Sequence, residues 1–145
     1  MKIKNFFLIS LILLMSFPFL IAGEKKDIVE AVKVNKLAEL LDLDNDMISQ
    51  LINIETKLKK MRKEYQENED ELVENLEKAI EEKNYEKTDD IIEKLDKLER
   101  EHLDESLKLR RDYAKKLSKE KRAKYILYEV KFKSTLKNKI MEKIK

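Results

Sequence analysis

The sequence predicts an all-α fold, an elongated antiparallel helical hairpin with short flanking helices. After residue 23 the chain contains no glycine and no proline, the residues that allow sharp turns or stop helices, and it has no cysteine anywhere. Apolar residues also recur at alternating steps of three and four, which is the spacing of one face of a helix. We therefore expect a few long helices joined by short connections.

The first 23 residues have the pattern of a secretory signal peptide. Two lysines precede an uncharged apolar run over residues 6–21, and the small residues Ala22 and Gly23 follow. We expect cleavage after Ala22 or Gly23, a periplasmic location, and a single helical domain over residues 24–145. The alternative is an uncleaved anchor, but Pro18 interrupts the run, which is shorter than the roughly 20 residues of a membrane-spanning helix.

Two helices are expected before the turn of the hairpin. The first covers about residues 26–41. Asp44 is expected to cap the start of the second helix, with Leu43 and Ile48 at the spacing of a hydrophobic staple. This helix runs to about residue 82 because its apolar residues keep a heptad spacing, listed from the start as Leu51, Ile54, Leu58, Met61, Tyr65, Leu72 and Ala79.

Two further helices are expected after the turn. Asn84 is the residue expected to adopt the left-handed conformation at the turn, because asparagine tolerates it when no glycine is present. A third helix then covers about residues 86–116 and carries Leu103 among its apolar residues. Ser118 is expected to cap a fourth helix that runs through Ile140.

Charge is segregated along the exported chain, which is neutral overall. Residues 24–56 have 4 basic and 8 acidic side chains, and residues 57–63 have 5 basic and no acidic ones. Residues 64–107 have 6 basic and 18 acidic side chains, and residues 108–145 have 15 basic and 4 acidic ones. A hairpin that turns near residue 84 therefore has an acidic tip, and residues 57–63 and 108–124 make its base basic. Two molecules placed antiparallel pair these charges, which predicts a homodimer. The alternative is that these charges are solvated on the surface and pair with no second molecule. The equal numbers of basic and acidic residues argue against a nucleic-acid partner.

The two helix starts, LDNDM at residues 43–47 and LSKEK at residues 117–121, echo each other. They resemble the twice-occurring Leu-Thr-x-x-Gln of the Spy/CpxP superfamily of periplasmic proteins. Neither copy is intact, since aspartate or serine replaces threonine, and methionine or lysine replaces glutamine. Residues 101–132 also resemble the second motif of that family and the helix that follows it. The matched motif positions are Leu43, Asp44, Met47, Leu117, Ser118 and Lys121.

The resemblance covers about residues 37–137 and implies a cradle-like antiparallel dimer of long helices. Some members of the family bind unfolded client proteins without ATP, and others are adaptors that restrain an envelope-stress sensor kinase. Others belong to zinc-resistance or heavy-metal-sensing branches. This chain departs from the metal-binding branch because it has no cysteine and a single histidine, His102.

The sequence points to neither an enzyme nor a cofactor or metal protein. It has no cysteine nucleophile, no Ser-His-acid spacing and no glycine-rich loop. His102 is in phase with Leu95 and Leu98, so we expect a partly buried histidine on a helix face rather than a ligand. Acidic residues near the turn are the alternative site for weak calcium or zinc binding, namely Asp70, Glu71, Glu74, Asp89, Asp90 and Glu93.

Binding of other proteins on helical surfaces is the function that the sequence favours. We expect an ATP-independent periplasmic chaperone or envelope-stress adaptor, with a zinc-responsive binding protein and a structural coiled-coil component as alternatives. Lysines of the last helix can also contact anionic lipid weakly. We expect a basic and aromatic surface that binds clients or the second copy of a dimer. The alternative is that its aromatic residues only pack the last helix onto the hairpin. The candidate residues of this surface are Lys57, Lys60, Arg110, Arg111, Tyr125, Tyr128 and Phe132.

Overall fold

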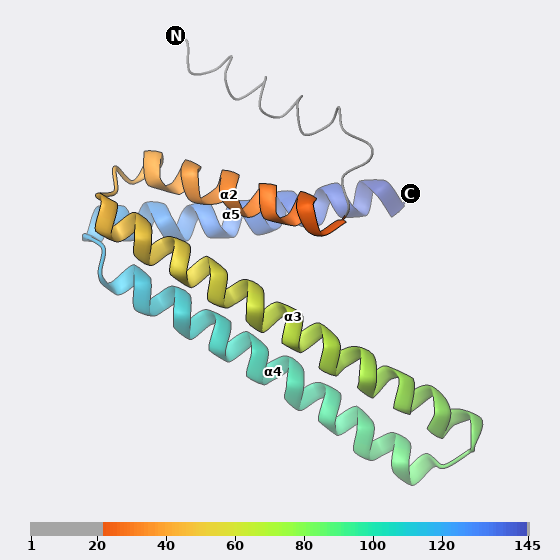
Figure 1. Ribbon diagram of the computed structural model, residues 1–145. Coiled ribbons are helices and arrows are strands. Elements are labelled where there is room, and N and C mark those ends of the chain that lie inside the picture. The colour runs from red at the N-terminus through yellow and green to blue at the C-terminus, as the bar shows by residue number, and fades with distance from the viewer. Residues whose placement is uncertain (1–21, 145) are drawn as a thin grey trace. The chain divides into compact units, whose positions relative to one another are not determined.

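The computed structural model describes residues 22–144, and they form four helices joined by short connections (Figure 1). No strand occurs in this part of the chain, so the all-α prediction is confirmed. None of its helices is both long enough and apolar enough to span a bilayer. The predicted leader up to residue 21 lies outside the described residues. The helices are α2 (Ala22–Leu40), α3 (Asn45–Glu81), α4 (Tyr85–Lys115) and α5 (Lys119–Ile144).

The chain divides into two compact units, Met1–Lys36 and Leu37–Lys145. The boundary falls inside α2, so the described part of the first unit is the helical segment 22–36. The last residues of α2, from Leu37 onward, belong to the second unit together with α3, α4 and α5. All of the predicted surface and helix-start residues lie in the second unit.

α3 and α4 form an antiparallel hairpin because each helix has an apolar face at heptad spacing (Figure 1). Leu51 is buried near one end of the hairpin, and Ala79 and Ile91 are buried near the turn. Midway along the hairpin, the rings of Tyr65 and His102 stack with their centroids 4.5 Å apart. At 1.5 Å per residue, the 37 residues of α3 span about 55 Å.

Leu103, which was expected among the apolar residues of the third helix, lies outside the face of α4 that packs on α3. Leu103 is 53% exposed, whereas Ser106 is buried and His102 is half-buried. His102 thus takes the helix-face position expected from its spacing to Leu95 and Leu98, and this prediction is confirmed.

The turn between α3 and α4 uses Lys83, not Asn84, in the left-handed conformation. Lys83 has a φ of 54°, and its N–H donates to the Ile80 carbonyl at 3.0 Å. The N–H of Asn84 donates to the Ala79 carbonyl at 2.9 Å, which completes a Schellman motif. The prediction for Asn84 was therefore wrong: its φ is −90°, and its side chain caps α4 by accepting from the N–H of Lys87 at 3.2 Å.

The end of α2 has the same motif without glycine. Asp42 has a φ of 46°, and its N–H donates to the Glu39 carbonyl at 3.3 Å. The N–H of Leu43 donates to the Ala38 carbonyl at 3.1 Å. A left-handed residue other than glycine costs roughly 1 kcal/mol, so the chain accepts this strain at two sites to end its helices sharply.

α5 is joined to the end of α4 by a short connection that Arg122 holds closed. Its guanidinium donates to the carbonyl oxygens of Ala114 at 3.0 Å and Lys115 at 3.0 Å, the last two residues of α4, and to that of Leu117 in the connection at 3.3 Å. From this end, α5 diverges from the hairpin (Figure 1). The largest fully buried side chains of the second unit gather toward the same end, and they are Leu37, Leu41, Leu51, Leu58, Tyr113 and Tyr125.

Candidate functional site

The two predicted helix starts both carry the expected caps. The Asp44 carboxylate accepts a hydrogen bond from the N–H of Met47 at 2.8 Å, and the Ser118 hydroxyl accepts one from the N–H of Lys121 at 3.3 Å. Each cap satisfies one of the N–H groups that a helix leaves unpaired at its start. Asp44 and Ser118 therefore have the structural role that was predicted for them, although neither is a threonine.

The fold brings these two starts together at one end of the second unit. We call this end, formed by the first turns of α3 and α5 and the last turn of α4, the base, and the opposite end at residues 82–85 the tip. The ammonium of Lys121 donates to the Asp42 carbonyl at 2.7 Å, and the Tyr113 hydroxyl donates to the Met47 carbonyl at 3.2 Å. Leu117 is buried and Leu43 is half-buried at the same end. Four of the six motif positions, Leu43, Met47, Leu117 and Lys121, thus help to join the helices, whereas Asp44 and Ser118 cap their own.

A polar cluster with little exposure lies beside the base and contains residues of α3, α4 and α5. Arg110 of α4 pairs with Glu129 of α5, with 3.5 Å between Nε and Oε2, and their side chains are only 19% and 7% exposed. Glu55 of α3 is also buried. Tyr125 of α5 is fully buried, and its ring meets that of Tyr113 edge-on at 5.4 Å. α5 is therefore attached to the hairpin through charged as well as apolar groups.

The buried tyrosines hold their protons more tightly than free tyrosine does. Burial, with a smaller contribution from the charge of Asp44, raises the pKa of Tyr113 to about 12. Burial also raises the pKa of Tyr125, and the carboxylates of Glu129 and Glu55 raise it further. The hydroxyl of Tyr125 has no hydrogen-bond partner among residues 22–144, whereas that of Tyr113 donates to a carbonyl. The hydroxyl of Tyr113 therefore stabilises the folded protein, whereas the hydroxyl of Tyr125 destabilises it.

Tyr125→Phe is expected to raise the free energy of unfolding by about 1 kcal/mol at neutral pH, because a buried hydroxyl without a partner destabilises the folded state. Tyr113→Phe is expected to lower it by about 1 kcal/mol, because the hydrogen bond from the tyrosine hydroxyl to the Met47 carbonyl is lost. Urea unfolding followed by circular dichroism measures both. If the two variants shift in the same direction, the assignment of the two hydroxyls is wrong.

The free energy of unfolding measured in this way also depends on pH. Because the folded protein keeps the Tyr113 proton up to a pKa of about 12 and the unfolded chain releases it near pH 10, stability must fall as the pH rises from about 10 to 12. Tyr113→Phe is expected to lose less stability over that interval than the unsubstituted protein. Equal losses in the two proteins would contradict this assignment.

The seven residues predicted to form a client or dimer surface do not share one environment. Arg110 and Tyr125 belong to the buried cluster, so their placement on a surface is corrected here. Tyr128 and Phe132 are half-buried on α5 and stack with ring centroids 5.9 Å apart. Burial raises the pKa of Tyr128, and the carboxylates of Glu129 and Glu55 add to this effect. The remaining three are exposed, and they are Lys57, Lys60 and Arg111.

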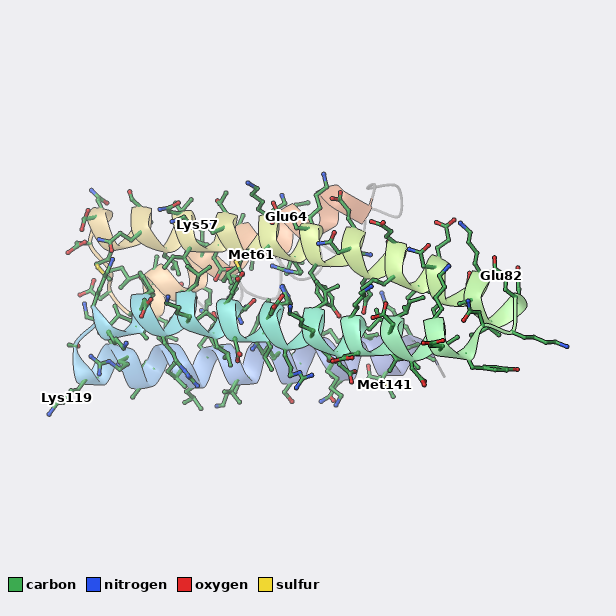
Figure 2. All side chains as sticks on the ribbon, turned by 90° about the horizontal axis from the view of Figure 1, so that it is seen from below. Lys57, Met61, Glu64, Glu82, Lys119 and Met141 are labelled. Carbon is green, nitrogen blue, oxygen red and sulfur yellow. The ribbon has the colours of Figure 1, made fainter. Side chains whose placement is uncertain are left out.

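The charge along the hairpin differs from one end to the other, as expected. Figure 2 shows Glu82 at the tip and Lys119 at the base, at opposite ends of the second unit. The stacking of Tyr65 on His102, together with the hydrogen bond from Lys116 to Gln50 at 2.8 Å, sets the register of the two helices. In this register the basic run 57–63 lies opposite about residues 103–110. Residues 103–110 include Asp104 and Glu105 as well as Lys108 and Arg110, so the basic run lies opposite charges of both signs.

The middle of the hairpin shows how the single histidine is used. His102 is half-buried against the ring of Tyr65. The Tyr65 hydroxyl donates to the Glu69 carboxylate at 2.8 Å. This hydrogen bond, then burial and the charge of Glu99, raises the pKa of Tyr65 to about 12. His102 thus packs against another helix as an aromatic ring.

Two of the acidic residues near the tip form ion pairs along their own helices. Glu74 is paired with Lys78 at 2.8 Å and Asp90 with Lys94 at 2.6 Å. The hydrogen bond and charge of Lys78 lower the pKa of the Glu74 carboxyl. Within residues 22–144, no three side chains of the histidine, cysteine or carboxylate type are placed to hold a metal ion together.

Glu55 and Glu129 are the important residues that the sequence reasoning missed. Both are buried. Glu55 lies four residues after Leu51 and three before Leu58, and Glu129 lies four residues after Tyr125 and three before Phe132. The heptad spacing was the available signal, since a glutamate that interrupts an apolar face in phase must be buried with it.

Comparison with protein-family models, with curated proteins and with solved structures finds no match to this chain.

Proposed function

We propose that this protein binds unfolded or partner proteins on its helical surfaces, without ATP, as a periplasmic chaperone or envelope-stress adaptor. The observation that carries the proposal is one face of α5. Tyr128 and Phe132 stack there and are half-exposed, and Lys131 and Lys139 are exposed at helical spacing beside them. We call these four residues the aromatic-basic face.

This face has the chemistry to hold protein segments of varied sequence. Aromatic rings that are partly exposed bind apolar side chains, and the flexible stems and charged ends of lysines accommodate both apolar and acidic neighbours. Such groups recognise a class of segment rather than one sequence. The resemblance of the two helix starts to the Spy/CpxP superfamily supports the same function.

Light scattering from an aggregating, chemically unfolded client protein tests the proposal. We expect less than one equivalent of this protein to suppress the scattering, with no ATP and to the same extent with and without added zinc. Suppression only in the presence of zinc would instead favour the metal-responsive alternative. No suppression at any ratio would contradict the chaperone function and leave the envelope-stress adaptor and the structural coiled-coil component.

The double variant Tyr128→Ser, Phe132→Ser tests the face itself and is expected to reduce suppression several-fold. Ile52→Ser on α3 is the matched control, because Ile52 is 51% exposed and lies outside the face. Circular dichroism checks that each variant is folded. Lys131→Glu with Lys139→Glu, at exposed positions, is expected to weaken suppression more for an acidic client than for a basic one. Equal activity of all these variants would show that clients bind elsewhere.

A further inference from the structure

The half of the hairpin toward the tip has two chemically different sides. We call the buried and half-buried residues of α3 and α4 between residues 65 and 102 the inner positions. Each residue that directly follows an inner position is apolar, acidic or a glutamine, and each residue that directly precedes one is charged or an asparagine. Two antiparallel helices turn in opposite senses when seen from one end, so the following residues of both helices lie on the same side of the hairpin. The preceding residues, which include four lysines, lie on the other side.

Four apolar residues on the first side, together with three carboxylates of α4 on that side, form a surface that we call the tip strip. Its apolar members are exposed, from 41% for Val73 to 56% for Ile80. Single exposed apolar residues are common on proteins, but four of them on one side of two neighbouring helices indicate an interaction surface. The members of the tip strip are Val73, Ile80, Asp89, Ile92, Asp96, Glu99 and Leu103.

The charge of the two sides also differs. On the side away from the tip strip, lysines form ion pairs within α4, at 2.6 Å between Lys94 and Asp90 and at 3.8 Å between Lys97 and Glu101. No basic residue directly follows an inner position between residues 65 and 103. The tip strip is therefore apolar and negatively charged, and a partner that fits it must be apolar and basic.

At the base, α5 occupies this same side of the hairpin. Arg110 directly follows the half-buried Leu109, and its guanidinium pairs with Glu129 of α5. Tyr113, whose ring meets that of Tyr125 of α5, is fully buried there. Toward the tip α5 diverges from the hairpin (Figure 1), and four leucines at inner positions are only half-buried, namely Leu72, Leu76, Leu95 and Leu98. A helix on the tip strip would continue toward the tip the packing that α5 provides at the base.

The members of the tip strip follow a definite order along the hairpin. In the register set by the stacked rings of Tyr65 and His102, the order from the tip is apolar, acidic, apolar, acidic, acidic and apolar, over about 24 Å. A helix of 18 residues has about this length. The members in that order are Ile80, Asp89, Val73 with Ile92, Asp96, Glu99 and Leu103.

We infer that the tip strip binds a basic amphipathic helix of another protein. Along one face, at steps of three, four, three, four and three residues, this helix carries apolar, basic, apolar, basic, basic and apolar side chains. Its basic residues meet the carboxylates of the strip, and its apolar residues cover those of both helices, as when an amphipathic helix enters a groove. The partner becomes the third helix of a bundle at the tip.

The last helix of a second copy does not have this order. The strip requires two apolar residues seven positions apart, whereas lysines lie seven residues after the exposed Ile126 and Val130 of α5. A helix of a different protein is therefore the occupant that the strip fits. Because the tip strip is separate from the aromatic-basic face, this inference does not depend on the proposed client binding.

A designed peptide tests the inference by fluorescence anisotropy with the full chain at about 0.1 M salt. The probe is a fluorescein-labelled peptide with leucine at positions 1, 8 and 18, lysine at positions 4, 11 and 15, and alanine or glutamine elsewhere. The control peptide has the same composition with leucines and lysines exchanged. We expect the probe to bind at micromolar concentrations, at least about fivefold more tightly than the control. Equal affinities would show attraction by charge alone and would overturn the inference.

Variants of the protein test whether the probe binds on the tip strip. Asp96→Lys and Ile92→Ser are each expected to weaken its binding at least about fivefold. Asp90→Lys makes the same change of charge on the opposite side and is expected to weaken it less than about twofold. Circular dichroism checks that each variant is folded. Equal effects of Asp96→Lys and Asp90→Lys would overturn the inference, and so would self-association that Asp96→Lys abolishes without any binding of the probe, because a second copy would then occupy the strip.

Discussion

Arg110→Met is expected to lower the free energy of unfolding by about 3 kcal/mol, because it leaves the buried carboxylate of Glu129 without its guanidinium. Glu55 is buried in the same cluster, so the loss of the positive charge affects two carboxylates. A protein of this size has a total stability of roughly 5–15 kcal/mol. Urea unfolding followed by circular dichroism measures the change.

Two further variants make this result specific to the buried pair. Arg111→Met changes the neighbouring, exposed arginine and is expected to change stability by less than about 0.5 kcal/mol. Arg110→Met combined with Glu129→Leu removes both charges and is expected to recover most of the loss, since apolar residues of similar volume can replace a buried pair. If Arg110→Met and Arg111→Met have equal effects, the pair does not stabilise the attachment of α5.

Leu51→Ala is expected to lower the free energy of unfolding by about 2–5 kcal/mol. Leu51 is fully buried in the core at the base. Its truncation removes apolar contacts and leaves a cavity, because the caps and hydrogen bonds at the base restrict how far the helices can close on it. Thermal or urea unfolding measures the loss.

The neighbouring residue is the control for this variant. Ile52 is 51% exposed on the other side of α3, and Ile52→Ala is expected to cost less than about 1 kcal/mol. A similar cost for both substitutions would mean that α3 does not pack on its neighbours through the face that contains Leu51.

The positions of the helix starts could be predicted because their causes are local. Asp44 and Ser118 accept hydrogen bonds from N–H groups three residues away, and such short-range geometry depends little on the rest of the fold. The turn after α3 was harder to predict. Asn84 tolerates the left-handed conformation, but it also caps α4, and the second role places the left-handed conformation on Lys83 instead.

The surface residues were harder to assign because arginine and tyrosine have both an apolar body and a polar end. Arg110 and Arg111 are adjacent in sequence and chemically identical, yet one is buried in an ion pair and the other is exposed. On α5, Tyr125 is fully buried whereas Tyr128, one turn further on, is only half-buried. Nothing local separates the members of these pairs, since their burial depends on which helix packs against them.

The sequence by itself determined that this protein consists of long helices, where two of them start, and how charge divides along the chain. The lack of glycine and proline, the capping side chains and the order of charged residues are properties of the chain that need no partner. Only the tertiary structure decided which charged and aromatic side chains are buried. Glu55, Arg110 and Glu129 come from three different helices, and a charge is buried only where another helix supplies its partner and excludes water.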